Sequence, residues 1–344
     1  MMKIEAYAKK TYVALKNPFQ TVFSVNPLVI DEVSNSFKEN NCAYYVGVKN
    51  TVVIPQSLIT HLSEYGFLQH TRDEMAYGGR AIDIYRRNPL TDRFMTGSSS
   101  GTALNVFYGI NDFGIGTDGG GSVLAPAASL NLYGFISPLL CAEEMEKHTR
   151  NSTEGISFYP SIGYIARDFS VIERAIKSTL EIKENNNEVR LIVADAFMKT
   201  TCGKKIDGLA KKKHLLLSEV KFPILSGKRK DLIHFLENMN DEDIVISLEG
   251  PVDLEGIGDT VFGHFDERTT ASQCKSGKGF MRVVNMCNKT ALILPRKELA
   301  CGLLLICKSD VGTISKMLEL AYELLEENSE LVTRYFQNLD MYLK

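Results

Sequence analysis

The chain has 344 residues, of which 44% are hydrophobic and 24% are charged. These proportions are those of an ordinary globular protein, and they exclude disordered, collagen-like and coiled-coil chains. The 39 basic and 42 acidic residues give a net charge of −3, so no overall positive field attracts nucleic acid or an anionic membrane. We therefore expect no nucleic-acid partner and no membrane association.

The N-terminal stretch and the cysteines predict a cytoplasmic protein. The first sixteen residues, MMKIEAYAKKTYVALK, carry charges every few positions and lack the apolar region of a signal peptide, and no run of 18 apolar residues occurs. The seven cysteines form no C-x-x-C pair, and none stands at metal-ligand spacing from a histidine. Free thiols in a reducing compartment and no metal site are the expectation.

Apolar patterning predicts a mixed α/β fold. Short apolar runs predict five strands, and amphipathic patterns predict four helices between them. In chain order these are a strand at 42–48, helices at 57–68 and 169–182, a strand at 188–197, a helix at 230–239, strands at 243–250, 290–295 and 303–308, and a helix at 311–328. No repeat or low-complexity linker divides the chain, and the polar stretch at 183–188 is expected to be a surface loop.

One segment, residues 95–129, departs from this pattern because it concentrates glycine and hydroxyl residues where a core would need larger side chains. Such a density indicates loops that wrap around something small. One use is a phosphate cradle, since Gly114, Gly116 and Gly119 satisfy the string G-x-G-x-x-G. A dinucleotide site needs a helix that opens at this turn, and GGSVLAPAAS shows no clear helical stripe, so the pattern does not favour nucleotide binding.

The other use is an oxyanion site. The successive N–H groups of Gly119, Gly120, Gly121 and Ser122 can converge on one point because no side chain blocks the approach. Ser122 would then lie where an attacked carbonyl stands. Serine needs a base to become a nucleophile, and because no histidine lies near it in the sequence, the remaining option is a lysine acting through a hydroxyl relay.

The two serine loops resemble the amidase signature family. GSSSGT at 97–102 and GTDGGGS at 116–122 match the family pattern GGSSGGS…GTDxGGSxR. The resemblance implies a Ser–cisSer–Lys triad in which Ser122 is the nucleophile and Ser98, on a cis peptide bond, relays the proton. The string YYVGVKN is similar to the strand that ends in the family's lysine, which implies that Lys49 is the base.

The resemblance also implies supporting residues. Gly97 and Asp118 are expected to hold the two loops, Asp118 chiefly as a structural acceptor for nearby backbone N–H groups. The stretch TRDEMAYGG is similar to the TNMDEFAMG stretch of the family, and Met75 and Tyr77 in it either line the substrate pocket or simply pack.

Two positions depart from the family pattern. Leu124 stands where the family has an arginine, and Ile136 stands where it has a lysine, and the chain is shorter than the family's usual length. A non-catalytic relative of the family is therefore left as an alternative. The presence of Lys49, Ser98 and Ser122 favours retained catalysis.

The resemblance implies a single α/β domain over 1–344, with a mixed central β-sheet flanked by helices and a signature core at 45–140. The implied activity is hydrolysis of a small amide or peptide-like amide through an acyl-enzyme, with no metal or organic cofactor. Two alternatives are left open: an amide-forming acyltransferase or amidotransferase that uses the same acyl-enzyme, and a non-catalytic amidase-like subunit. The expected partner is a small-molecule amide, and a homo-oligomer or a partner subunit is left open.

Overall fold

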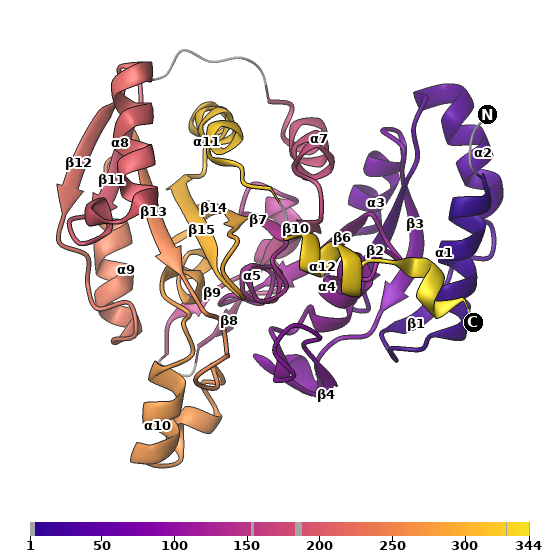
Figure 1. Ribbon diagram of the computed structural model, residues 1–344, viewed down its shortest axis with the longest axis horizontal. Coiled ribbons are helices and arrows are strands. Elements are labelled where there is room, and N and C mark those ends of the chain that lie inside the picture. Colours follow the sequence, from indigo (N-terminus) through magenta and orange to yellow (C-terminus); the bar gives the residue numbers. More distant parts are fainter. Residues whose placement is uncertain (1–3, 153–154, 183–187, 328, 344) are drawn as a thin grey trace.

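An eleven-stranded mixed β-sheet runs through the molecule, and helices cover both of its faces (Figure 1). The computed structural model describes all residues except 1–3, 153–154, 183–187, 328 and 344. In spatial order the strands are β1 (Val22–Val25), β3 (Phe67–Asp73), β2 (Tyr44–Lys49), β6 (Phe113–Asp118), β10 (Ser161–Ala166), β7 (Tyr133–Ser137), β14 (Lys289–Pro295), β15 (Gly302–Lys308), β13 (Asp243–Glu249), β11 (Arg190–Ala194) and β12 (Leu216–Val220). Strand β2 is parallel to β3 and β6, β11 is parallel to β12 and β13, and the remaining pairs are antiparallel.

The helices form two layers around this sheet. One face carries α3 (Gln56–Ser63), α7 (Phe169–Leu180), α8 (Thr201–Lys213) and α11 (Val311–Leu324), and the other carries α4 (Ser100–Phe107), α5 (Leu124–Ser129) and α9 (Arg229–Glu237). The remaining helices are α1 (Ile4–Lys16), α2 (Val29–Asn40), α6 (Ala142–Glu146), α10 (Glu267–Cys274) and α12 (Glu330–Tyr335). The expected α/β fold with a mixed central sheet is confirmed.

Each sheet face has its own apolar core. Along β15, Leu303 and Leu305 join one core while Leu304 and Ile306 join the other, as the two-residue period of a strand requires. A strand that is buried on both faces has no polar alternation. This is why the central strands read as continuous apolar runs in the sequence.

Most of the predicted elements are confirmed. The five predicted strands correspond to β2, β11, β13, β14 and β15, and three predicted helices correspond to α7, α9 and α11. Helix α11 begins after Asp310, whose carboxylate accepts the N–H of Thr313 at 2.9 Å. Most of the polar stretch predicted as a loop at 183–188 lies outside the described residues.

The helix predicted at 57–68 is wrong at its C-terminal end. Helix α3 stops at Ser63, and Phe67 already begins β3. Gly66 separates the two with a φ of +87°, a left-handed conformation that turns the chain and that glycine adopts without steric cost. The apolar residues after this turn are buried by the sheet rather than by the helix.

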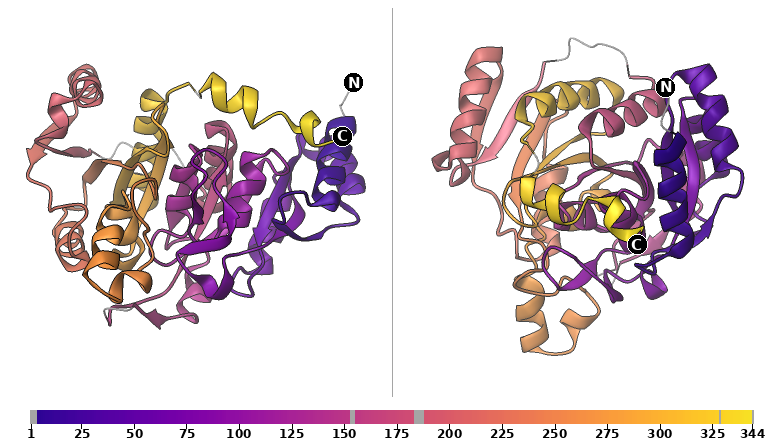
Figure 2. Two further views of the ribbon diagram at one scale, coloured as in Figure 1. Left: turned by 60° about the horizontal axis from the view of Figure 1, so that its bottom comes forward. Right: turned by 45° about the vertical axis from the view of Figure 1, so that its right-hand side comes forward.

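The two termini and three small projections lie outside the layers. The segment after α11 crosses to the N-terminal end of the molecule, where η6 (Leu339–Tyr342) contacts α1 (Figure 2). The hairpins β4 (Ile82–Arg87) with β5 (Phe94–Thr96) and β8 (Arg150–Asn151) with β9 (Ser157–Phe158) project at the lower edge of Figure 1, near α10. Within the described part of the chain, no helix is long and apolar enough to cross a membrane.

The glycines of the G-x-G-x-x-G string serve close packing. Gly114 and Gly116 lie inside β6, directly under α4. A Cβ atom at Gly114 would lie 2.6 Å from Thr102 Cγ2, and one at Gly116 would lie 2.6 Å from Ser99 Oγ. The missing side chains therefore let α4, and the serine loop before it, approach the sheet.

Two helical glycines give a matched stability test of this close packing. Replacing exposed Gly208 in α8 by alanine should raise the free energy of unfolding by about 0.5–1 kcal/mol, because alanine is the better helix former and nothing lies within 4 Å of its Cβ. Gly101→Ala in α4 should instead destabilise the protein, because its Cβ would lie 2.3 Å from the carbonyl oxygen of Glu74. Urea unfolding of both variants measures the two signs, and a stabilised Gly101→Ala variant would contradict the packing argument.

Candidate active site

Parallel pairing of β2 and β6 brings Lys49 to the glycine-rich segment. Val48 pairs with Ile115, so Lys49, the last residue of β2, lies beside the end of β6. Its Nζ donates to Ser98 Oγ at 2.7 Å and to Thr117 Oγ1 at 2.9 Å. The lysine is only 3% exposed, so these two hydroxyl groups replace the water that a surface lysine would bind.

Burial changes the proton affinity of Lys49. Removal from water lowers the pKa of its amine to about 7; the charge of Asp118 opposes this shift and the charge of Arg150 adds to it. Above pH 7 the amine is therefore neutral and has a free lone pair. A neutral amine 2.7 Å from a serine hydroxyl can accept that hydroxyl's proton.

The loop that carries Ser98 turns without the expected cis peptide bond. The Gly97–Ser98 bond is trans, and among the described residues only the Gly250–Pro251 bond is cis. Gly97 has a φ of +73°, which makes the turn through a conformation open to glycine. A side chain at this position would also collide with Pro126, since a Cβ would lie 2.6 Å from its Cδ. The resemblance is therefore wrong about the cis bond, whereas the contact of Ser98 with Lys49 is present.

Ser122 lies next to the Ser98 loop. Its carbonyl oxygen accepts the N–H of Ser99 at 3.3 Å, so the two serine loops touch through their backbones. Ser122 is partly exposed, and its hydroxyl makes no hydrogen bond with any residue that the structure describes. The structure thus joins the predicted base to the predicted relay directly, and it leaves the predicted nucleophile adjacent and open to solvent.

Asp118 organises the glycine loop. Its Oδ1 accepts the N–H groups of Gly120 at 3.0 Å and Gly121 at 2.6 Å. Its Oδ2 accepts the N–H groups of Val123 at 2.7 Å and Leu124 at 3.2 Å. The side chain is fully buried, and four donors satisfy its charge. Asp118 thus has the role of structural acceptor that the sequence analysis favoured.

These bonds correct the predicted oxyanion hole. Gly120 and Gly121 direct their N–H groups to Asp118 and cannot point at a substrate in this arrangement, because an ionised carboxylate is the strongest acceptor within their reach. The N–H groups of Gly119 and Ser122 have no protein acceptor among the described residues. Of the three predicted glycine donors, only Gly119 remains available.

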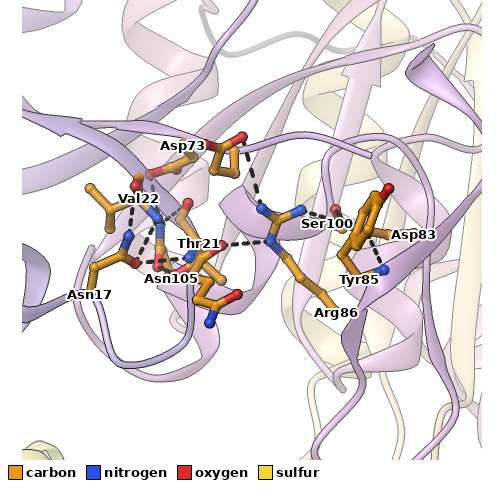
Figure 3. A network of polar contacts seen from close by, with 11 residues as sticks. Asn17, Thr21, Val22, Asp73, Asp83, Tyr85, Arg86, Ser100 and Asn105 are labelled. Atoms are coloured by element: carbon orange, nitrogen blue, oxygen red, sulfur yellow. Dashed lines mark hydrogen bonds and ion pairs between the residues drawn. The ribbon is translucent and has the colours of Figure 1, made fainter. Parts of the chain in front are cut away.

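A polar network holds α4 behind the Ser98 loop (Figure 3). Asp83, fully buried, accepts the hydroxyl of Ser100 at 2.5 Å and an N–H of Arg86 at 2.7 Å. Further along the helix, Asn105 donates to Asp73 at 2.7 Å and accepts the hydroxyl of Thr21. These bonds fix the start of α4, two residues after Ser98.

A second carboxylate holds the segment that packs against the glycine loop. Glu249, at the end of β13, accepts the backbone N–H groups of residues 279–281, and burial raises its pKa to about 7. The carbonyl of Met281 lies 3.2 Å from where a Cβ at Gly121 would be. Sequence reasoning missed this support, because nothing in the local sequence of Glu249 shows which loop will fold over it.

The predicted substrate contacts lie beside Ser98. The N–H of Ala76 donates to the carbonyl of Ser98 at 3.2 Å, which places the flanking Met75 and Tyr77 next to the loop. Met75 is partly buried and Tyr77 is 78% exposed. Thr117 was not predicted, although it stands within the GTDGGGS string and its strand position directs it toward Lys49.

Leu124 has a packing role. It is fully buried and belongs to the apolar core on the α4 and α5 face of the sheet. An arginine at this position would place its charge in that core at a cost that its hydrogen bonds would have to offset. The departure from the family pattern therefore leaves the loop well packed, with its backbone held by Asp118.

Comparison with known proteins finds amidases. The Amidase family model matches residues 60–191, which include Ser98 and Ser122. Amidase 1 of Arabidopsis thaliana is 36% identical over 138 residues, covering 37% of this chain and 30% of that protein. Amidase 1 of Oryza sativa is 31% identical over 121 residues, covering 33% of this chain and 26% of that protein. The matched stretch thus spans less than a third of either relative.

Solved structures share the fold over nearly the whole chain. One described as the crystal structure of an amidase has a TM-score of 0.61 at 15% identity, covering 94% of this chain and 96% of that one. The Kluyveromyces lactis allophanate hydrolase has a TM-score of 0.61 at 14% identity, covering 94% of this chain and 70% of that one. The resemblance to the amidase signature family is confirmed: the chain carries an amidase-family region within an amidase-like fold.

The burial of Lys49 predicts a pH-dependent stability. Between pH 7 and about 10.5 the unfolded chain binds a proton at this amine that the folded protein does not bind, so the free energy of unfolding rises with pH, by at most about 1.4 kcal/mol per unit. Below pH 7 both states bind the proton and the contribution no longer changes with pH. Urea unfolding from pH 6 to 10 should show this rise in the parent and its loss in Lys49→Met. The exposed Lys212→Met is the control, and parallel curves for the parent and Lys49→Met would contradict the low pKa.

Proposed function

We propose that the protein is an amide hydrolase in which Ser122 attacks the amide carbonyl and Lys49 is the base that acts through Ser98. The observation that carries this proposal is the 2.7 Å contact between a buried lysine with a pKa of about 7 and a serine whose loop touches that of a partly exposed second serine. The matched relatives named amidases and the fold shared with an allophanate hydrolase support the same class of reaction.

The contact of Lys49 with Ser98 supplies the inner half of the proposed proton path, and the adjacent loop of Ser122 supplies the outer half. As Ser122 Oγ forms a bond to the carbonyl carbon, its proton moves to Ser98, and the proton of Ser98 moves to the neutral amine of Lys49. The same path then returns a proton to the leaving nitrogen, and the carbon–nitrogen bond breaks. Water repeats the attack on the acyl-enzyme and releases the acid. Thr117, the second partner of Lys49, holds the amine in position during formation and hydrolysis of the acyl-enzyme.

The oxyanion is stabilised by the donors that Asp118 leaves free. We assign this role to the N–H groups of Gly119 and Ser122, because neither is used within the described protein. Gly120 and Gly121 act indirectly: their bonds to Asp118 hold the loop in place, so that it does not need to reorganise when charge develops. The mechanism makes no use of a metal or an organic cofactor.

Covalent labelling tests the nucleophile. A fluorophosphonate probe should add one adduct to the parent, on the peptide that contains Ser122, and Ser122→Ala should abolish it. Lys49→Ala should slow labelling by at least about 100-fold, because the serine then lacks its base. The exposed Ser226→Ala is the matched control and should label normally. Full labelling of Ser122→Ala would refute the assignment.

The pH dependence of turnover tests the base. The free enzyme is active only when Lys49 is neutral, so kcat/KM should rise about tenfold per pH unit below pH 7 and level off above it. Release of ammonia from a primary amide, measured from pH 5 to 9, gives the profile. A profile that is flat over this range, with chemistry shown to be rate-limiting, excludes lysine as the base.

A further inference from the structure

The short hairpin of β8 and β9 lies against the glycine loop. The ring of Phe158, in β9, contacts Gly119, since a Cβ on that glycine would lie 2.9 Å from Phe158 Cε2. The base of the hairpin is fixed, because Asn285 donates to the carbonyl of Tyr159 at 2.9 Å and accepts the hydroxyl of Ser161. The hairpin therefore forms a wall against the glycine loop that carries Ser122.

Arg150 stands on this wall. It is the cross-strand partner of Phe158, and partners in register project to the same face of an antiparallel pair. The arginine side chain thus leaves the hairpin on the face from which Phe158 reaches Gly119. Its positive charge also lowers the pKa of Lys49, which agrees with a position near the catalytic residues.

The charge of Arg150 is uncompensated. The residue is exposed, and within the described structure its side chain forms neither an ion pair nor a hydrogen bond. The carboxylate at the site, Asp118, is fully buried and already accepts four N–H groups. With Lys49 neutral, the loop region around Ser122 therefore presents a guanidinium that no carboxylate of the described residues neutralises.

We propose that Arg150 is a specificity residue that binds a carboxylate of the substrate, so that the preferred substrates are amides that also carry an ionised carboxyl group. A guanidinium offers a planar pair of N–H donors that matches a carboxylate, and a partner supplied by the substrate would complete it. This inference rests on the proposed amide hydrolysis at Ser122. Arg150 lies outside both serine loops.

Matched pairs of amides test the proposal by turnover. Malonamate, succinamate and glutaramate are each compared with the corresponding neutral diamide, by ammonia release at pH 9, well above the pKa of about 7 that burial gives Lys49 in the parent. The parent should prefer at least one of the acids in kcat/KM, and Arg150→Gln should reduce that preference about 10- to 100-fold while leaving the diamide nearly unchanged. Arg150→Glu should reverse the preference.

Lys147→Gln is the control. It removes the same charge from an exposed residue of the same segment, three positions away, and should keep the parent's preference. The proposal is overturned if Arg150→Gln keeps the preference, if Lys147→Gln loses it equally, or if the parent has none.

Binding separates this proposal from the proposed hydrolysis. Isothermal titration calorimetry of the same acids and diamides should show tighter binding of the acid to the parent, lost in Arg150→Gln. If binding depends on Arg150 but no ammonia is released, the hydrolysis fails and the assignment of Arg150 stands. If ammonia is released without any dependence on Arg150, the assignment fails and the hydrolysis stands. An acid series that neither binds nor reacts refutes the assignment.

Discussion

Four backbone N–H groups converge on the buried carboxylate of Asp118, and the geometry of the candidate active site depends on this convergence. A carboxylate at the end of a central strand, away from water, needs several donors to remain there. The glycine loop and the first turn of α5 supply them by wrapping around it. Ser122 lies between Gly121, whose N–H binds Oδ1, and Val123, whose N–H binds Oδ2. The side chain of Ser122 takes no part in these bonds.

The second constraint is the burial of an amine. Lys49 reaches the site because β2 and β6 are parallel neighbours whose ends lie at the same edge of the sheet. An amine in this position has little water around it, so the fold itself lowers its proton affinity. Ser98 and Thr117 provide the hydrogen bonds that a buried nitrogen requires. The same burial therefore lowers the pKa of the amine and leaves these two hydroxyl groups to hold it in position.

Electrostatic balance links the site to its surroundings. Glu249 and Asp118 each gather backbone N–H groups, so both carboxylates are satisfied locally and neither acts as a partner for an outside cation. Arg150 on the β8–β9 hairpin is left as a positive charge at the rim. A neutral buried lysine, two satisfied carboxylates and an arginine side chain with no partner among the described residues are the features on which the proposed preference for an anionic amide rests.

The sequence by itself determined the strands that are buried on both faces, most of the amphipathic helices and the two serine loops. These are local signals: an apolar run, a 3.6-residue period, or a glycine string with its hydroxyl groups. The sequence also indicated Lys49, but only through its likeness to a family strand. Its low pKa depends on which strand lies next to β2, and local sequence does not contain that information.

Only the tertiary structure decided the remaining features. The trans bond before Ser98, the use of Gly120 and Gly121 by Asp118, the support from Glu249 and the placement of Arg150 each depend on contacts between distant segments. A glycine in the sequence shows that a side chain is absent, but not whether its N–H faces a substrate or a carboxylate. That choice is made by whichever acceptor the folded chain brings closest, because a buried donor must find one.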